Sequence, residues 1–120
     1  MTKEPAKEIE DLCELEEKLS DPNNQQMLKN ELSYLINSRN KDTRSVSAIF
    51  RKIATSSVWS EFSYVGRRDK KSFIKSFPLL NQTILDLIIS GHSLQNDIAQ
   101  GLIASFLKAE PANIKRASSL

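Results

Sequence analysis

The stretch that decides the fold is residues 49–77, IFRKIATSSVWSEFSYVGRRDKKSFIKSF. It holds the only tryptophan of the chain, Trp59, four of the five phenylalanines and the densest group of basic residues. Apolar residues stand at helical spacing before Ser56 and again from Phe73 onward, so each end of the stretch is expected to bury one helix face. The stretch therefore predicts two helical segments joined by a basic loop.

The loop contains Gly66, which permits the positive φ that a tight reversal often needs. Two arginines, an aspartate and two lysines follow it directly, as Arg67-Arg68-Asp69-Lys70-Lys71. Two interpretations remain open. Charge runs usually just face water, but aromatic anchors on both sides could also hold this loop rigid so that its cations grip phosphates.

The region before this stretch begins with an amphipathic helix over residues 4–19. Its apolar stripe consists of Ile9, Leu12, Leu15 and Leu19, and six acidic side chains crowd the other faces. The stripe either docks on the rest of the chain or pairs with a second copy as a short coiled coil. The acidic face is a third option, as a site for a protein partner.

Two further helices are expected before the aromatic stretch ends. Asp21 suits an N-cap and Pro22 the first position of a helix that runs to about residue 36. Its inward residues are expected to be Met27, Leu28, Leu32, Leu35 and Ile36. Asp42 or Thr43 is expected to cap the next helix, whose buried residues are Val46, Ile49, Phe50 and Ile53.

After the stretch, Phe77-Pro78 marks a break, because proline disfavours helix in the residue before it. The following segment is apolar on more than one face, so it is expected to be the central helix, with Gly91 as its C-terminal cap. A last helix is expected over residues 93–108, ended by Glu110-Pro111.

These patterns predict an all-α fold, a compact bundle of about five to six helices with a basic loop between central helices. Three glycines and four prolines are too few for an all-β fold with many tight turns. Residues 1–21 form the acidic N-terminal helix, residues 22–109 the helical core and residues 110–120 a mobile tail.

The composition argues against several classes of function. One cysteine, Cys13, and one histidine, His92, stand apart from each other and from acidic clusters, so no metal site of known spacing is expected. Without a glycine-rich phosphate loop or a Gly-x-Ser-x-Gly motif, no catalytic residue, cofactor or small-molecule substrate is predicted. There is no apolar leader or membrane-spanning run, so we expect an intracellular protein, nuclear or cytoplasmic.

Charge is unevenly distributed along the chain. Residues 1–21 carry three lysines and eight acidic side chains, whereas residues 41–76 carry nine basic and three acidic side chains. The formal net charge of +2 hides this asymmetry. A basic middle region favours contact with a polyanion.

Five pieces of the chain resemble the layout of a family of arthropod proteins, the domain of unknown function numbered 4806. They are residues 15–19, 32–36, 49–53, 62–73 and 79–88, which lie within a run from Ile9 to Ile88 that spans about two thirds of the chain. The aromatic-Gly-basic-Phe core from Phe62 to Phe73 is the most specific piece. Tyr64 stands where the family more often has tryptophan, and Ile53-Ala54 replaces a pair of large apolar residues. The pattern is also distantly similar to BEN domains, small all-α modules of chromatin proteins, several of which bind DNA through a loop and a helix end.

The resemblance implies a non-enzymatic, BEN-like module over residues 22–109 that binds DNA in a chromatin or transposon-related context. The phosphate contacts would be Arg67, Arg68, Lys70, Lys71 and Lys75, with Arg44, Arg51 and Lys52 as a second patch. Trp59, Tyr64 and Phe73 would anchor the loop rather than stack on bases. The alternative is a module for protein interaction or homodimerisation, which uses the N-terminal stripe or the helix over residues 93–108.

Overall fold

The computed structural model describes residues 5–36, 41–66 and 70–118, with side chains described as far as residue 109. The described residues form seven α-helices, one 3-10 helix and two short strands. They are α1 (Ile9–Lys18), α2 (Pro22–Leu32), η1 (Ser33–Leu35), α3 (Asp42–Ile53), α4 (Ser56–Trp59), β1 (Phe62–Ser63), β2 (Lys71–Ser72), α5 (Phe73–Ser76), α6 (Pro78–His92) and α7 (Asn96–Ser118). The predicted all-α fold is confirmed.

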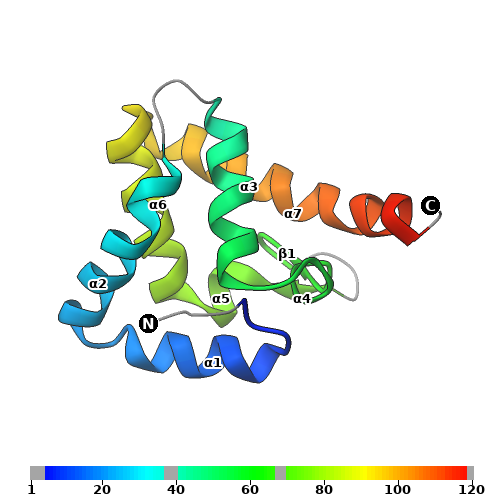
Figure 1. Ribbon diagram of the computed structural model, residues 1–120, viewed down its shortest axis with the longest axis horizontal. Helices are drawn as coiled ribbons and strands as arrows, with labels where there is room; N and C mark the ends of the chain where they lie inside the picture. The colour runs from blue at the N-terminus through cyan, green and yellow to red at the C-terminus, as the bar shows by residue number, and fades with distance from the viewer. Residues whose placement is uncertain (1–4, 37–40, 67–69, 119–120) are drawn as a thin grey trace.

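Helix α6 is the central element. It contacts α1, α2, α3, α5 and α7, so every long helix of the bundle packs against it. Figure 1 shows α2 beside α6 at the left, α1 beneath them, and α3 crossing in front of α7. Its buried residues point to several sides of the helix axis and include Leu80, Ile84, Leu85 and Ile88, as expected of a helix surrounded by others.

Helix α1 packs against the core with its leucine stripe. Leu12 and Leu19 are fully buried, Leu15 is 7% exposed, and Ile9 is partly buried against the core. Of the three uses considered for this helix, intrachain docking is therefore the one that the structure shows. The stripe offers no free surface for a coiled coil, because its leucines already fill the core.

Residues 5–8, which precede α1, are not helical, so the expected helix start at residue 4 is wrong. The backbone N–H of Ala6 donates to the carbonyl of Ile53 at 2.8 Å, and the N–H of Thr55 donates back to the carbonyl of Ala6 at 2.9 Å. These bonds form a single parallel bridge between Ala6 and Ala54. A helical turn here would remove both bonds.

Of the two predicted N-caps, the one for α2 is confirmed and the one for α3 is wrong. Asp21 caps α2 as predicted, and its side chain accepts from the backbone N–H of Asn23 at 2.9 Å, with Pro22 at the first helical position. The predicted cap of α3, Asp42 or Thr43, is one or two residues too late, because Lys41 is the N-cap and both candidates lie inside the helix. Met27, predicted to be inward, is 50% exposed.

The predicted cap of α6 and the predicted end of α7 are also wrong. Helix α6 continues through Gly91 to His92, and Ser93 takes the left-handed C-cap conformation with φ 53°. Helix α7 continues past Pro111 to Ser118, in the region expected to be a mobile tail. Its C-terminal end runs out beyond the rest of the molecule (Figure 1).

Candidate nucleic-acid interface

The loop over residues 64–70 is closed at its base by the two strands. Phe62 pairs with Lys71 and Ser63 with Ser72, in parallel register. The N–H of Lys71 donates to the carbonyl of Glu61 at 3.1 Å. The sequence prediction of a plain loop between helices did not include this pairing, although the alternation of Phe62 and Tyr64 is a weak period-two signal.

Further hydrogen bonds fix the turn itself. The N–H of Gly66 donates to Oγ of Ser63 at 2.9 Å, and Gly66 takes φ 81° as its sequence position predicts. The N–H of Ile74 and the hydroxyl of Ser72 both donate to the carbonyl of Tyr64, at 3.2 and 3.3 Å. The first half of the loop is thus tied to the strand and helix that follow it.

Buried aromatic side chains support both strands from beneath. Phe62 and Phe73 are fully buried, and Trp59 lies between them with ring centroids 6.3 and 5.6 Å away. The indole N–H of Trp59 donates to the carbonyl of Phe50 at 2.7 Å, which satisfies its one polar atom. Phe77 packs on Phe62 at 5.5 Å. Two of the predicted anchors, Trp59 and Phe73, are therefore core residues.

Tyr64, the third predicted anchor, is half-buried between the loop and α6. Burial raises the pKa of its phenol above the ordinary value of 10.0, and hydrogen bonding by the Asn81 side chain partly offsets this. The other polar atom of that amide, Oδ1 of Asn81, is buried without a hydrogen-bond partner among the described residues. Asn81 was not singled out from the sequence, because it lies in an apolar helix well after the loop.

The cations that the structure describes at this loop point to solvent. Lys71 and Lys75 are exposed and Lys70 is partly exposed. Within the described ranges none of these three lysines is ion-paired. Arg67 and Arg68 lie outside the described residues and stay predictions from the sequence.

The second predicted group lies along α3. Arg44 and Arg51 are exposed and, seven residues apart, share one face of the helix, while Lys52 is partly exposed beside them. The guanidinium of Arg51 lies 5.8 Å from the ring centroid of Phe106 in α7, within the range of a cation–π contact.

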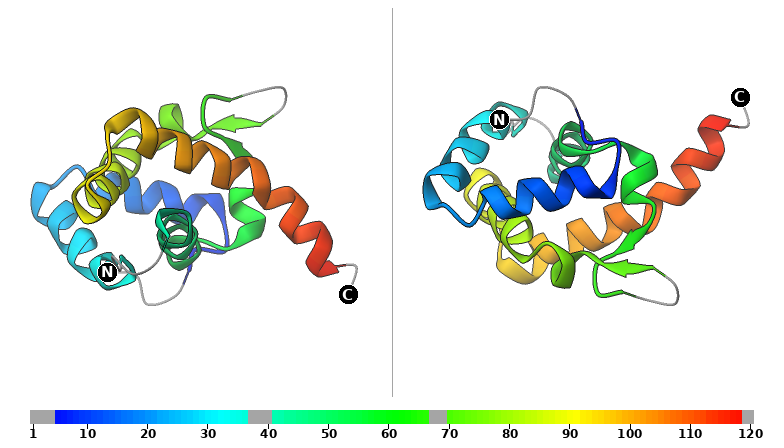
Figure 2. Two further views of the ribbon diagram at one scale, coloured as in Figure 1. Left: turned by 90° about the horizontal axis from the view of Figure 1, so that it is seen from above. Right: turned by 90° about the horizontal axis from the view of Figure 1, so that it is seen from below.

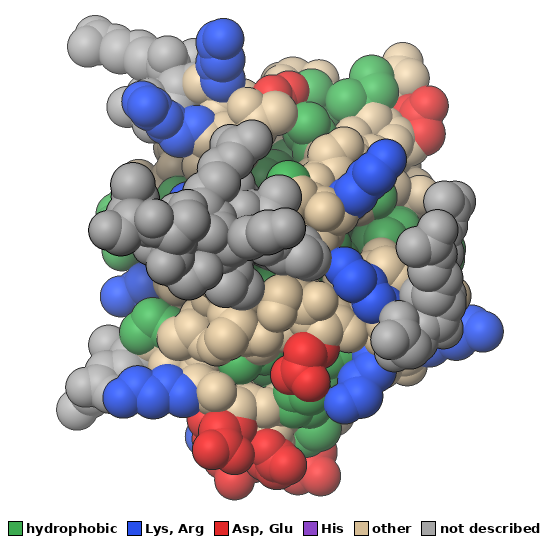
Figure 3. Space-filling view, turned by 90° about the vertical axis from the view of Figure 1, so that its right-hand side faces the viewer, with side chains coloured by type: hydrophobic (Ala, Val, Ile, Leu, Met, Phe, Trp, Pro, Cys, Tyr) green, Lys and Arg blue, Asp and Glu red, His purple; other side chains and the backbone are tan. Residues whose placement is uncertain are grey.

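The two basic groups do not form one patch. Helix α3 and the strands β1 and β2 lie on opposite sides of α7 (Figure 2). In a view toward the end of α7, Lys and Arg side chains stand on both sides of the face and acidic side chains gather along its lower edge (Figure 3). A ligand that approaches the loop therefore contacts the lysines there before it can reach the basic residues of α3.

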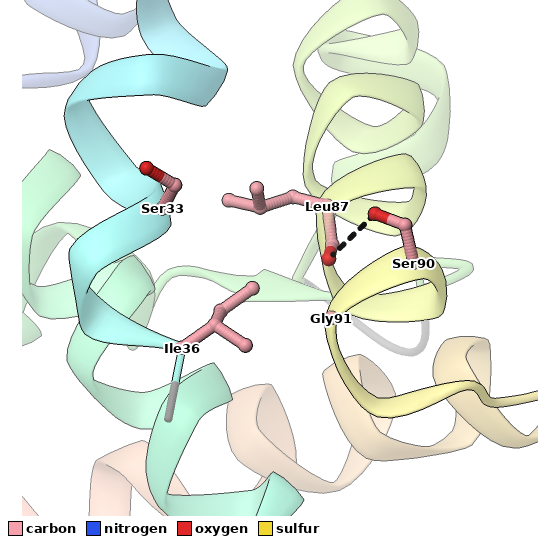
Figure 4. Close-up of a pocket in the computed structure, with 5 residues that line it drawn as sticks. All are labelled: Ser33, Ile36, Leu87, Ser90 and Gly91. Carbon is pink, nitrogen blue, oxygen red and sulfur yellow. Dashed lines mark hydrogen bonds between the residues drawn. The ribbon is translucent and has the colours of Figure 1, made fainter. Parts of the chain in front are cut away.

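Two further features of the described residues lie apart from the loop. An open hollow of about 370 Å³ between η1 and α6 is lined by Ser33, Ile36, Leu87, Ser90 and Gly91 (Figure 4). None of these five lining residues has an ionisable side chain. His92 forms a hydrogen bond of 2.9 Å between its Nε2 and Oγ of the buried Ser45, which joins α6 to α3.

Searches for metal and membrane sites found none in the part of the chain that is described. No group of three or more His, Cys, Asp or Glu side chains there could hold a metal ion. None of the helices is both long and apolar enough to cross a membrane, over the same residues.

Comparison with known proteins gives one match. The family model described as Domain of unknown function (DUF4806) matches residues 1–87. This range covers the leucine stripe, the loop and most of α6, and it ends before α7. No curated protein and no solved structure matches the chain significantly.

Proposed function

The chain belongs to the DUF4806 family, and we propose that it is a non-enzymatic module that binds DNA through the loop between β1 and β2. Lys70, Lys71 and Lys75 contact phosphates, with Arg67 and Arg68 beside them in the sequence. The distant resemblance of the sequence pattern to BEN domains, several of which bind DNA through a loop and a helix end, supports DNA as the ligand. A nuclear, chromatin or transposon-related role is part of the same proposal.

The observation that carries the proposal is the contrast between the two sides of the loop base. On the inner side Phe62 and Phe73 are fully buried, and on the outer side Lys71 and Lys75 are exposed. Lysines on a rigid base lose less conformational entropy on binding than lysines on a flexible loop. Phosphates are the natural partner of such cations, because an ammonium group is a compact point charge with three donors.

The test is binding of the purified chain to a labelled duplex, measured by fluorescence anisotropy at several salt concentrations. We expect the affinity to fall as salt rises, with a logarithmic slope of about −0.9 for each phosphate contacted. Replacement of Lys71 and Lys75 by alanine should weaken binding and reduce the size of that slope by about 2.

A matched control variant replaces Lys7 and Lys18 by alanine. Both lysines are exposed, and their loss changes the net charge by the same amount, but they flank or lie in the acidic helix α1. The control should bind as the wild type does. An equal loss in both variants would mean that only net charge matters, and an affinity indifferent to salt would reject the proposal.

The alternative function is protein interaction or homodimerisation. Since the stripe of α1 is buried, the surfaces that remain for it are the exposed acidic face of α1 and the surface of α7, where Ile98 is 48% exposed. Light scattering of the chain with and without duplex separates the two functions. A stable dimer that ignores the duplex and dissociates after Ile98→Lys would favour the alternative.

A further inference from the structure

We infer that the ligand of the loop is a double helix held through its phosphate backbone, and not a single strand whose bases stack on the protein. This inference rests on the proposed function and names the class of nucleic acid. It follows from where the aromatic rings lie relative to the cations.

Proteins that bind single strands combine cations with exposed aromatic rings on which successive bases stack. The rings nearest the lysines here are not exposed. Phe62 and Phe73 are fully buried and Phe77 is 2% exposed. Phe62 is the first residue of β1, and Phe73 begins α5 directly after β2, so both lie next to the residues that close the loop.

These rings cannot turn outward without opening the core. Trp59 packs edge-on against Phe50 and Phe73, at 4.9 and 5.6 Å, and Phe73 packs against Phe77 at 6.2 Å. The hydrogen bond from the Trp59 indole to the carbonyl of Phe50 would be lost as well. A base that replaced one of these contacts would have to disrupt the others.

The three remaining aromatic side chains of the described residues do not provide a platform either. Phe106 is 7% exposed and stacks on Phe50 with ring centroids 4.9 Å apart. Tyr64 is half-buried with its phenol turned toward Asn81. Tyr34 is 67% exposed, but it belongs to η1, on the α2 side of the molecule and away from the loop (Figure 2). No aromatic ring of the described residues therefore offers a stacking surface beside Lys71 and Lys75.

A duplex needs no such surface, because its bases are already stacked and its phosphates face outward at a density of about one charge per 1.7 Å of axis. Lys71 and Lys75, each a point charge on a flexible stem, suit phosphates that they can reach from a fixed base. The contacts described are therefore those that position a duplex rather than those that read unstacked bases.

The experiment compares one labelled duplex of mixed sequence, about 20 base pairs long, with each of its separated strands and with an oligothymidine of the same length. Affinity is measured by anisotropy at about 50 and about 200 mM salt. The emission of Trp59, the only tryptophan, is recorded in the same titrations. The full chain is used throughout.

We expect the duplex to bind at least about tenfold more tightly than any single strand at the lower salt, since stacking adds nothing for the strands. Trp59 emission should stay unchanged at saturation. A single strand that binds as tightly as the duplex, or that quenches Trp59, overturns this inference and leaves the proposed function standing. If neither nucleic acid binds, the proposed function fails and this inference fails with it.

Discussion

The carboxylate of Glu16 in α1 accepts a hydrogen bond of 2.9 Å from the backbone N–H of Leu80, which lies 64 residues further along the chain. Its other oxygen accepts from the N–H of Leu79 at 2.8 Å. The residue before α6, Phe77, has no side-chain cap to offer, and Pro78 has no N–H to satisfy. The N–H of Asn81 donates to the carbonyl of Phe77. Glu16 thus completes the start of the central helix from another element.

We predict that Glu16→Gln lowers the free energy of unfolding by about 1–2 kcal/mol. The amide keeps one acceptor oxygen but loses the second acceptor and the negative charge that the helix N-terminus favours. Urea denaturation followed by circular dichroism measures the change.

Glu14→Gln is the control for this prediction, because Glu14 is exposed on the same helix and loses the same charge. It should change stability by no more than about 0.5 kcal/mol. Equal effects of the two substitutions would mean that the charge of α1, and not the cap on α6, is responsible.

A second prediction concerns Gly91, which was expected to end α6 but lies inside it. A Cβ at this position would lie 2.4 Å from Cγ2 of Ile36 and 3.0 Å from its Cδ1. We predict that Gly91→Ala destabilises the chain by about 1–3 kcal/mol, as overpacking does. Ile36→Ala should relieve much of that effect in the double variant, which a double-mutant cycle would reveal as coupling.

Gly101 provides the matched substitution, because a Cβ there meets nothing within 4 Å. Both glycines lie within helices, so alanine gains about the same helix propensity at each. Gly101→Ala should therefore stabilise the chain by about 0.5–1 kcal/mol. If Gly91→Ala stabilised it too, the packing of Ile36 on α6 would not be as the structure shows.

Periodicity predicted the parts of the fold that depend on local burial. The stripe of α1, the apolar α6 and the buried face of α3, with Val46, Ile49 and Phe50, all follow from apolar residues at helical spacing. Gly66 was identified as a turn residue for a reason that the structure bears out, its positive φ.

The features that could not be predicted from the sequence depend on contacts between segments that are distant along the chain. Glu16 looks like any other carboxylate of an acidic helix, and only the approach of α6 makes it a cap. In the sequence Gly91 looks like a C-cap, because its close packing against Ile36, which is far away along the chain, cannot be seen there. Pro111 is a strong stop signal, yet α7 continues through it, and we have no physical account of that continuation.

A third prediction uses the pKa of Tyr64, which burial raises above 10.0 in the folded chain. Below about pH 10 both the folded and the unfolded chain hold this proton, so stability does not depend on it. Above that pH the unfolded chain loses the proton first, and the free energy of unfolding falls until the folded pKa is passed.

Denaturation of the wild type and of Tyr64→Phe between about pH 9 and about pH 12 measures this effect. The phenylalanine variant keeps the buried ring and lacks the titrating group, so the wild type should lose stability relative to it as the pH rises. Lysines titrate in both proteins and cancel in the difference. Parallel curves for the two proteins would show that Tyr64 is not buried as described.

The last prediction connects the geometry of the loop to binding. Gly66 has φ 81°, and a Cβ there would lie 3.0 Å from Cβ of Ser72, so Gly66→Ala is both strained and crowded. We expect a loss of about 1–2 kcal/mol in stability and weaker duplex binding, because the base that holds Lys71 shifts.

Gly66→Asn tolerates the positive φ better but meets the same crowding. If φ dominates, asparagine should recover most of the stability and the affinity; if crowding against Ser72 dominates, both variants should lose them equally. Full affinity in a destabilised Gly66→Ala protein would separate the loop from binding and direct attention to Arg44 and Lys52 on α3.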